Sequence, residues 1–510
     1  MARLTQDPTS VASPDTARPR RRVFLTGAAG NWGRRVLDHF RERAETFDVV
    51  ALVLPSPKDL AIIRRYEDME NLEVVFGDLT DYQAVERCVR GADVVLHIGA
   101  VVSPVADDYP ELAHRVNVGS IRNIIRAVQA QPDPARIAVV GVGTIAETGD
   151  RNPPHHWGRV GDPLRVSQFD EYGQSKVIAE KLLVESGLPR WAWVRQTGIF
   201  HPGVLEIRDP IMTHSTLGGV MEWVSVEDAA RLMVNVSEAD VPTEFWGGIY
   251  NIGGGEGWRL TNWQLQTRMT AALGVRDVRD WYDRNWFATR NFHGQWYSDS
   301  DVLQALVPFR EDTFDAALAR AIAANPGLKI AGRIPSWLVK NLVLKPLTIR
   351  PRGTMHYVRE GNADAVSAYF GSPAEWEAIG DWDTFWPSRP SRTPTLLDHG
   401  YDETIASAQW GAGVYRDVAM HRGGELLSED PIVGEIAAPL EWRCAFGHVF
   451  TGSPRLILTA GHWCPVCILD VPGYKAQATR NAFLAQLELP FAGADPVSAV
   501  QQFDGATVKG

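Results

Sequence analysis

The sequence predicts an α/β fold built on a doubly wound parallel sheet. Three observations on residues 22–236 lead to this fold class: short apolar runs recur along the chain, helical segments separate them, and a glycine-rich turn joins the first run to the first helix. Near-continuous apolar strands are typical of parallel sheets that helices cover on both faces, because such strands meet no solvent. A smaller substrate-binding lobe and a C-terminal extension are expected to follow the sheet.

The expected strands and helices alternate along this part of the chain. The apolar runs predict strands at Val23–Thr26, Val49–Leu54, Leu72–Phe76, Val94–Ile98, Ile137–Val140 and Trp191–Arg195. The segments between and after them predict helices at Asn31–Arg43, Asp81–Arg90, Pro110–Gln129, Glu171–Glu185 and Glu227–Val236.

The chain of 510 residues has room for two to four domains. We expect a disordered lead-in (1–20), a sheet domain (21–333) whose substrate lobe spans about 196–333, an irregular connecting segment (334–400) and a C-terminal domain (401–510). Two helices, at about 402–421 and 473–488, are expected in the last domain, before a polar tail. The aromatic stretch Trp281–Tyr297 is more typical of a core or an interface than of a binding surface.

Composition narrows the classes of protein that fit. Apolar residues make up 45% and charged residues 22% of the chain, which is typical of a globular protein. The net charge of −11 argues against nonspecific binding of nucleic acid. No apolar run approaches the roughly 18 residues of a membrane span, and the N-terminus lacks the apolar segment of a secretory signal. Four cysteines in a chain of this length predict a reducing, cytoplasmic location. Since no apolar run is long enough to span a membrane, we also expect no membrane partner.

The glycine-rich turn predicts a dinucleotide site. Gly27, Gly30 and Gly33 lie between the first strand and the first helix, with the spacing G-x-x-G-x-x-G. Glycines let the backbone turn tightly and approach a diphosphate, and the first N–H groups of the helix then face the anion. The alternative is a tight turn that holds no ligand, but the complete strand–turn–helix context favours the cofactor.

The choice between NAD and NADP rests on the end of the second strand. An acidic residue usually accepts the ribose 2′-hydroxyl there, and none follows Leu54. Ser56, Lys58 and Arg34 are able to meet a 2′-phosphate instead, so NADP is slightly favoured, although both basic side chains fit a solvated role equally well. Asp78, after the third strand, either bonds the adenine amine or caps the next helix.

Tyr172 and Lys176 form the candidate catalytic pair. The segment YGQSK places a phenol and an ammonium four residues apart, on one face of a helix. A tyrosine with its ordinary pKa near 10 is a poor base at neutral pH, and a neighbouring positive charge is expected to lower that pKa. A pair with this spacing is common by chance, and its position about 140 residues after the glycine turn is what favours catalysis.

Together these motifs resemble the extended short-chain dehydrogenase/reductases, the NAD-dependent epimerase/dehydratase group with a Rossmann fold. TGAAGNWG is similar to that family's TGxxGxxG, YGQSK to its YxxxK, and His97–Ala100 and Asn117 stand at its cofactor segments. The resemblance implies catalysis by Thr144, Tyr172 and Lys176. It implies that the cofactor contacts Gly27, Ala29, Gly30, Asn31, Trp32, Gly33, Arg34, Asp78, Leu79, Ile98, Gly99, Ala100, Asn117, Tyr172, Lys176 and Thr197. It also implies a homodimer formed through the helix that carries the tyrosine and its neighbour.

The resemblance covers residues 20–330 and does not fix the substrate. Thr148 replaces the tyrosine that is usual in the family's S-S-x-A-x-Y-G segment, so one pocket contact differs. Several side chains form either an apolar pocket, for an aromatic or lipophilic substrate, or part of the core. They are His155, His156, Trp157, Phe200, His201, Met212, His214 and the aromatic residues of 281–297.

A cysteine cluster near the C-terminus predicts a structural zinc site. Cys464 and Cys467 have the spacing C-x-x-C, Cys444 supplies a third thiolate, and His448 is the expected fourth ligand, with His462 as its rival. Zinc prefers a tetrahedron of such donors, and the string resembles a zinc ribbon. Buried free thiols and a redox C-x-x-C motif are the alternatives. Four protein ligands would close the site, so we expect a zinc-stapled extension with little core of its own, acting as a staple or an interface element.

Three interpretations of the function remain open at this stage. The first is an NAD(P)-dependent oxidoreductase that transfers a hydride between an exchangeable nicotinamide cofactor and an alcohol or carbonyl of a small substrate. The second is an epimerase, dehydratase or lyase that holds NAD tightly and acts on a sugar-like substrate. We favour the first because the sequence offers no convincing clamp for a nucleotide diphosphate. A non-catalytic dinucleotide sensor is disfavoured because the Tyr172 and Lys176 pair is present.

Overall fold

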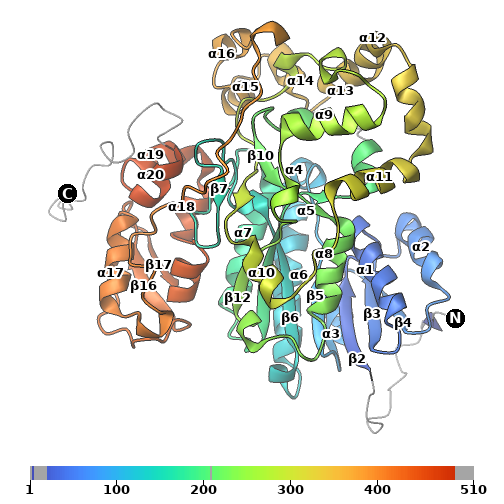
Figure 1. Cartoon of the computed structure of the whole chain (residues 1–510). Helices are drawn as coiled ribbons and strands as arrows, with labels where there is room; N and C mark the ends of the chain where they lie inside the picture. Colours follow the sequence, from blue (N-terminus) through green and yellow to red (C-terminus); the bar gives the residue numbers. More distant parts are fainter. Residues whose placement is uncertain (1–2, 5–19, 207–208, 489–510) are drawn as a thin grey trace.

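In the computed structural model, which describes residues 3–4, 20–206 and 209–488, the first part of the chain forms an eight-stranded sheet in which all neighbouring strands are parallel (Figure 1). The strand order is β1-β4-β3-β2-β5-β6-β8-β12. The strands span Arg3–Leu4 (β1), Arg21–Thr26 (β2), Phe47–Val53 (β3), Leu72–Phe76 (β4), Val94–His97 (β5), Ala138–Thr144 (β6), Trp191–Gln196 (β8) and Gly248–Asn251 (β12). The predicted doubly wound α/β fold is confirmed.

Helices cover both faces of the sheet (Figure 1). One face packs against α1 and α8, and the other against α3, α6 and α7, so each face has a buried apolar layer of its own. These helices span Asn31–Glu42 (α1), Tyr82–Val89 (α3), Gly119–Gln129 (α6), Glu171–Val184 (α7) and Val226–Asn235 (α8), and α2 (Pro57–Ile63) lies beside them. Among the described residues, we find no helix with the length and apolar character to cross a membrane.

Two predicted helices are interrupted. The helix expected at 110–129 consists of α5 (Pro110–Ala113), a π-helical turn (His114–Val118) and α6. The turn lies where Asn117 bonds the backbone of Val101 on a neighbouring loop, so a tertiary contact sets the helix geometry. The helix expected at 473–488 is broken between α19 (Tyr474–Ala478) and α20 (Ala482–Glu488), and the one expected at 402–421 begins only after Gly411, as α17 (Ala412–His421).

The lead-in expected to be disordered contains a short strand. Arg3–Leu4 form β1 and pair in parallel with β4, so that prediction is wrong for these two residues. Residues 1–2, residues 5–19 and the polar tail after 488 lie outside the described residues.

The expected substrate lobe contains short ladders and helices beyond the sheet. The ladders pair β9 (Ile199–Phe200) with β11 (Val224–Ser225), β10 (Val220–Glu222) with β13 (Arg259–Thr261), and β7 (Trp157–Gly158) with β14 (Trp296–Tyr297). The helices of the lobe are α9 (Asn262–Ala272), α10 (Ser300–Leu306) and α11 (Phe314–Ala324), while α4 (Val105–Asp108) and β7 belong to earlier loops of the sheet domain. Trp281, Tyr282, Trp286 and Phe287 are buried together, which confirms that this aromatic stretch is core.

The segment expected to be irregular over 334–400 is largely helical up to residue 377. It contains α12 (Ser336–Val339), α13 (Lys345–Thr348), α14 (Thr354–Arg359), α15 (Ala363–Phe370) and α16 (Pro373–Glu377). The physical reason is capping: Asn362 and Ser372 accept the N–H groups of the first turns of α15 and α16, and proline occupies first-turn positions where its missing N–H costs nothing.

The last described part, residues 401–488, is called the C-terminal module below. It joins α17, a small sheet of β15 (Glu425–Leu426), β16 (Leu440–Arg443) and β17 (Val449–Gly452), and the helices α18 (Pro465–Leu469), α19 and α20. The expectation of little core is wrong, because Trp442, Trp463, Tyr415 and Ile457 are buried in a cluster that extends to the first domain. Leu456 and Ala460 join the apolar layer of the α7 face of the sheet, so the module packs directly on it.

Candidate active site and metal centre

The glycine turn has the geometry of a close backbone approach. Gly27 has a φ of +72°, which favours glycine, and a Cβ there would lie 2.8 Å from the backbone of Gly99. A Cβ on Gly33 would lie 2.1 Å from the carbonyl oxygen of Gly27, so the first turn of α1 touches the turn itself. Gly30 is the N-cap of α1 and brings no side-chain cap, which leaves the first N–H groups of the helix open to an anion.

Buried hydrogen bonds fix the loop after β5 beside this turn. The Thr26 hydroxyl accepts the N–H of Gly99 and bonds Nδ1 of His97, at 2.9 and 3.0 Å. Burial, together with the charge of Lys176, lowers the pKa of His97 to about 3, so its imidazole stays neutral. Asn117 bonds both backbone groups of Val101 and the Ser175 hydroxyl of α7, which ties the loop to the catalytic helix.

Of the residues considered for a 2′-phosphate, Ser56 and Arg34 bond other groups of the chain. The Ser56 hydroxyl accepts the N–H of Asp59 as the N-cap of α2, and Lys58 is exposed. Arg34 bonds Asn31 and the carbonyl of Gly30, at the turn itself. Asp78 accepts the N–H and the hydroxyl of Thr80, so it caps a local turn.

Of the other residues expected at the cofactor, Ala29, Asn31 and Trp32 belong to the glycine turn and the start of α1. Leu79, Ile98, Gly99 and Ala100 follow β4 and β5, and Thr197 follows β8. In a parallel sheet, these loops at the carboxyl ends of the strands meet at one edge, where such folds bind their ligands.

Thr144 ends β6 and is buried within the first domain. Its hydroxyl accepts the N–H of Ala146, and its own N–H donates to Oε1 of Glu147 at 2.8 Å. This reciprocal capping holds a one-turn 3-10 helix, Ile145–Glu147, and fixes the direction of the threonine side chain.

Tyr172 lies in the first turn of α7 with 6% of its surface exposed. Nε2 of Gln196, at the end of β8, donates to its phenol oxygen at 3.3 Å. Burial and the nearby carboxyl of Glu147 raise the pKa of Tyr172, and hydrogen bonds with Gln196 and Thr144 lower it by less. The phenol therefore stays protonated at neutral pH in this structure.

Lys176 lies one turn further along α7 and is also buried. Its Nζ donates to the carbonyl of Val142 at 2.7 Å and stands 5.9 Å from the centre of the Tyr172 ring. Burial lowers the pKa of Lys176 to about 8, against a smaller opposite effect of Glu147. The expectation that the phenol is made acidic is wrong for this structure, since burial, followed by Glu147, raises the pKa of Tyr172.

The sequence did not predict a role for two residues of this site, Gln196 and Glu147. Gln196 is part of the segment RQTGIF, but only its contact with the phenol reveals a role. Glu147 is fully buried and touches both Thr144 and Arg195. A charged residue just after the end of an apolar strand gives no signal of burial in the sequence, whereas its position three residues after Thr144 is a detectable capping-box spacing.

A cavity of about 260 Å³ opens beside the first turn of α7. Aromatic side chains and carboxylates line it, among them Phe169, Tyr357, Tyr369, Asp107 and Asp108. The rings of Tyr357 and Tyr369 stack at 5.6 Å, and burial, with Asp170, raises the pKa of Asp107 to about 6.

Most residues considered for an apolar pocket belong to the core. Trp157 packs edge-on against Trp296 at 5.5 Å, and Phe200 is buried beside Phe314. His214 and Phe292 do line cavities, while His201 bonds Asn31 at the glycine turn.

The cysteine cluster gathers at one point of the C-terminal module. Cys444 follows β16, Cys464 and Cys467 lie at the start of α18, and His448 precedes β17. Their ligand atoms all lie within 4.8 Å of one another. His462 is not part of this group, because its Nε2 bonds Oε1 of Glu180 at 3.0 Å.

The distances within this cluster fit a zinc ion. In a tetrahedron, Zn–S bonds of about 2.3 Å and Zn–N bonds of about 2.0–2.1 Å place two sulfurs about 3.8 Å apart and sulfur and nitrogen about 3.6 Å apart. The sulfurs of Cys444 and Cys467 are 3.8 Å apart, and Nδ1 of His448 lies 3.4–3.5 Å from the three sulfurs.

Comparisons with known proteins agree with the fold. Residues 27–240 match a family model described as NAD(P)H-binding. Residues 27–240 form an NAD(P)-binding domain homologous to short-chain dehydrogenase/reductases. Among curated proteins, the chain is 27% identical over 199 residues to 3 beta-hydroxysteroid dehydrogenase/Delta 5-->4-isomerase of Mycobacterium tuberculosis, covering 36% of this chain and 48% of that protein.

Another relative is human 3 beta-hydroxysteroid dehydrogenase type 7, 26% identical over 223 residues, which cover 40% of this chain and 58% of that protein. The chain thus spans about half the length of these curated relatives. Among solved structures, UDP-Glc/GlcNAc 4-epimerase of Campylobacter jejuni has a TM-score of 0.48 and 16% identity, and the match covers 61% of this chain and 99% of that one.

Proposed function

We propose that the protein is an NAD(P)-dependent oxidoreductase of the short-chain dehydrogenase type, which transfers a hydride between the cofactor and an alcohol or carbonyl. The observation that carries the proposal is the buried phenol of Tyr172, hydrogen-bonded by Gln196 and one helical turn from Lys176, with Thr144 among the groups that lower its pKa. It lies in the same domain as a glycine turn whose helix start is open to an anion.

The glycine turn and the start of α1 would hold the diphosphate, and the loops after β4 and β5 would border the rest of the dinucleotide. When bound, the nicotinamide supplies or accepts the hydride. In the direction of reduction, Tyr172, protonated in the resting site, donates its proton to the substrate oxygen and becomes a phenolate; in the direction of oxidation, the phenol must first lose its proton to solvent, and the phenolate then takes the proton of the alcohol. Thr144 orients the same oxygen, and the positive charge of Lys176 stabilises the phenolate that forms when Tyr172 loses its proton. We keep NADP as the slightly favoured cofactor.

For the substrate, we propose a small molecule with an aromatic or lipophilic part. The cavity of about 260 Å³ beside α7 offers the faces of Phe169, Tyr357 and Tyr369. The relatives named as hydroxysteroid dehydrogenases support an alcohol or ketone on an apolar frame, since their names give such substrates. We also propose a cytoplasmic location.

Incubation of the protein with NADPH or NADH and a panel of aromatic and aliphatic carbonyl compounds tests the proposal. We expect cofactor oxidation with at least one aromatic ketone or aldehyde. Purified protein that retains NAD⁺ tightly and consumes no added cofactor would contradict it and favour an epimerase, dehydratase or lyase acting on a sugar-like substrate.

We further propose that Cys444, His448, Cys464 and Cys467 hold one structural zinc ion, on the strength of the distances given above. With four protein ligands the ion has no open position for a substrate, so its contribution is to the stability of the module. Metal analysis of the purified chain should find about one zinc per chain, and a value near zero after purification without chelators would contradict the assignment.

The homodimer remains a proposal that must take account of α7. The described residues of that helix contact the chain's own C-terminal module: Lys181 donates to the carbonyl of Thr451, and Glu185 accepts from Ser453. A dimer would therefore use α6 or another surface, and light scattering at micromolar concentration tests whether one forms.

A further inference from the structure

A buried polar network joins the catalytic turn to the C-terminal module. At its centre, Arg195 of β8 donates to both oxygens of Glu180 of α7, at 2.9 and 2.6 Å. The Nε of Arg195 also lies 3.2 Å from Oε2 of Glu147. All three side chains are at most 1% exposed, so none of them reaches solvent.

The C-terminal module supplies two further partners of this network. Nη2 of Arg195 donates to the carbonyl of Ala460 at 2.7 Å, and the imidazole of His462 bonds Oε1 of Glu180 at 3.0 Å. Gly461 between them has a φ of +78°, and a Cβ there would lie 2.0 Å from the backbone oxygen of Asp162. The loop Ala460–His462 thus packs directly on the first domain. Within the module, Arg422 donates a hydrogen bond to the carbonyl oxygen of His462.

The other end of the network is the turn that bears Thr144. Oε1 of Glu147 accepts the N–H of Thr144, and a Cβ on Gly143 would lie 2.5 Å from that same oxygen. The carboxyl of Glu147 therefore fixes where β6 ends and how the threonine hydroxyl points. Glu147 is also among the groups that raise the pKa of Tyr172, after burial.

We propose that His462 is a positioning residue for catalysis: through Glu180, Arg195 and Glu147, it holds the Thr144 turn in its active geometry. Only the kinetic part of this proposal, the effect on kcat, rests on the oxidoreductase function proposed above. It makes the C-terminal module a support of the active site as well as the holder of the proposed zinc ion.

The physical reason is that buried charges tolerate few changes of partner. Glu180 has three hydrogen bonds, two from Arg195 and one with His462, and removal of His462 leaves a fully buried carboxylate with one bond unfilled. Arg195 and Glu180 must then shift or admit water, and Glu147 shifts with them because it shares Arg195. A displacement of the catalytic group by about 1 Å is enough to reduce a rate by on the order of 100-fold.

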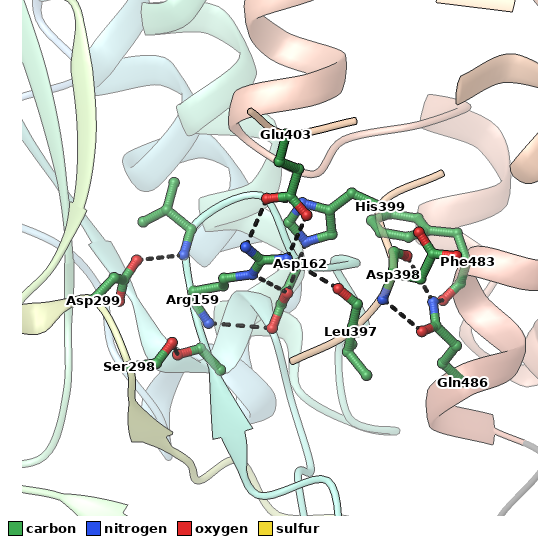
Figure 2. Close-up of polar contacts among 12 residues, drawn as sticks. Arg159, Asp162, Ser298, Asp299, Leu397, Asp398, His399, Glu403, Phe483 and Gln486 are labelled. Atoms are coloured by element: carbon green, nitrogen blue, oxygen red, sulfur yellow. Dashed lines mark hydrogen bonds and ion pairs between the residues drawn. The ribbon is translucent and has the colours of Figure 1, made fainter. Parts of the chain in front are cut away.

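A matched control exists on the same interface. The imidazole of His399 bonds Oδ1 of Asp162 at 2.9 Å, and Asp162 also accepts from Arg151, so this is a second buried histidine–carboxylate–arginine set (Figure 2 shows His399 and Asp162). Within the described residues, the side-chain bonds of Asp162 go to Arg151, Arg159 and His399 and not to the Thr144 turn. Loss of His399 should therefore weaken the interface without disturbing catalysis.

The test uses the full chain with the variants His462→Ala, His462→Gln and His399→Ala. Hydrogen exchange of the peptide that contains Thr144–Glu147 is read by mass spectrometry, together with zinc content and, where turnover is found, kcat and KM. We expect His462→Ala to speed exchange of this peptide at least fivefold and to lower kcat at least tenfold, with KM for the cofactor changed less than threefold and zinc retained. His462→Gln, which keeps a hydrogen-bond donor, should recover most of both effects, and His399→Ala should leave both readouts within twofold of the wild type.

Unchanged exchange in His462→Ala, or equal acceleration in His462→Ala and His399→Ala, would overturn the proposal. If His462→Ala does not fold, the variant Glu180→Gln replaces it, and exchange at the Thr144 turn equal to that of the wild type overturns the proposal in the same way. Hydrogen exchange needs no turnover, so the two proposals fail in different ways. If only the oxidoreductase assignment is wrong, His462→Ala still speeds exchange at the Thr144 turn although no activity is found.

Discussion

Replacement of Gly33 by alanine tests the glycine turn most sharply. A Cβ at this position would lie 2.1 Å from the carbonyl oxygen of Gly27, whereas real Cβ contacts stay beyond 3.0 Å, so turn and helix must separate by roughly 1 Å. The three nearest atoms all belong to the backbone of Gly27 and Ala28, so no side chain is able to move aside. Because alanine is otherwise favoured over glycine in a helix by about 0.5–1 kcal/mol, any loss comes from this contact.

We expect Gly33→Ala to weaken binding of NADPH and NADH by about 100-fold, which corresponds to about 2.7 kcal/mol. The physical reason is that the first N–H groups of α1 no longer converge on the diphosphate. Isothermal titration calorimetry with the purified chain measures the dissociation constants, and circular dichroism checks that the variant is folded.

Gly119→Ala is the matched control, since Gly119 is also helical and a Cβ there meets no atom within 4 Å. It should bind the cofactor as the wild type does, with equal or slightly higher thermal stability. A Gly33→Ala protein that binds both dinucleotides within threefold of the wild type would refute the reasoning about the turn.

Three further predictions concern the catalytic helix, the metal centre and the buried aspartate. Tyr172→Phe should lower kcat at least 100-fold and leave the dissociation constant of the cofactor within threefold, as measured by steady-state kinetics and calorimetry; residual activity above one tenth would argue against proton transfer by this phenol. Cys464→Ser should lose its zinc and melt at a lower temperature, whereas Cys88→Ser, a buried thiol outside the cluster, should keep one zinc per chain; equal zinc in both variants would count against the site. Burial alone would raise the pKa of Asp162, but Arg151 and His399 outweigh burial and hold this pKa below its usual value. The carboxylate therefore stabilises the fold above about pH 4, and this stabilisation is lost as the pH falls through the folded-state pKa. Asp162→Asn should therefore cost about 3–5 kcal/mol at pH 7, and its deficit in melting temperature should narrow towards pH 3; a constant deficit would contradict the assignment.

The sheet was predictable because buried parallel strands are apolar along their whole length. The run Leu72–Phe76 gives the bounds of β4 without error, and the other strand ends either coincide or differ by at most four residues. The interrupted helix at 110–129 was not predictable, because the π-helical turn accompanies a bond between Asn117 and a loop 16 residues earlier. The helices of 336–377 were hidden by their shortness, since each has at most eight residues and shows little periodicity.

The candidate site was also predictable only in part. Thr144, Tyr172, Lys176 and the metal ligands carry local spacing signals, and the structure brings each group together in space. The protonation of the phenol was not predictable, because it depends on burial and on Glu147. Arg195 and Glu180 lie 15 residues apart in the sequence and far from Ala460, so their common network exists only in the folded chain.

The proposed reaction requires the phenol of Tyr172 to reach the oxygen, and the nicotinamide to reach the carbon, of one carbonyl group of the substrate. A crystal structure of the complex with NADPH and a carbonyl ligand tests this claim most directly. The account predicts the diphosphate at the start of α1, and the ligand oxygen about 3 Å from the hydroxyls of both Tyr172 and Thr144, with its carbon about 3–3.5 Å from the nicotinamide ring. A nicotinamide ring seated away from Tyr172, with the phenol still enclosed by protein, would contradict it.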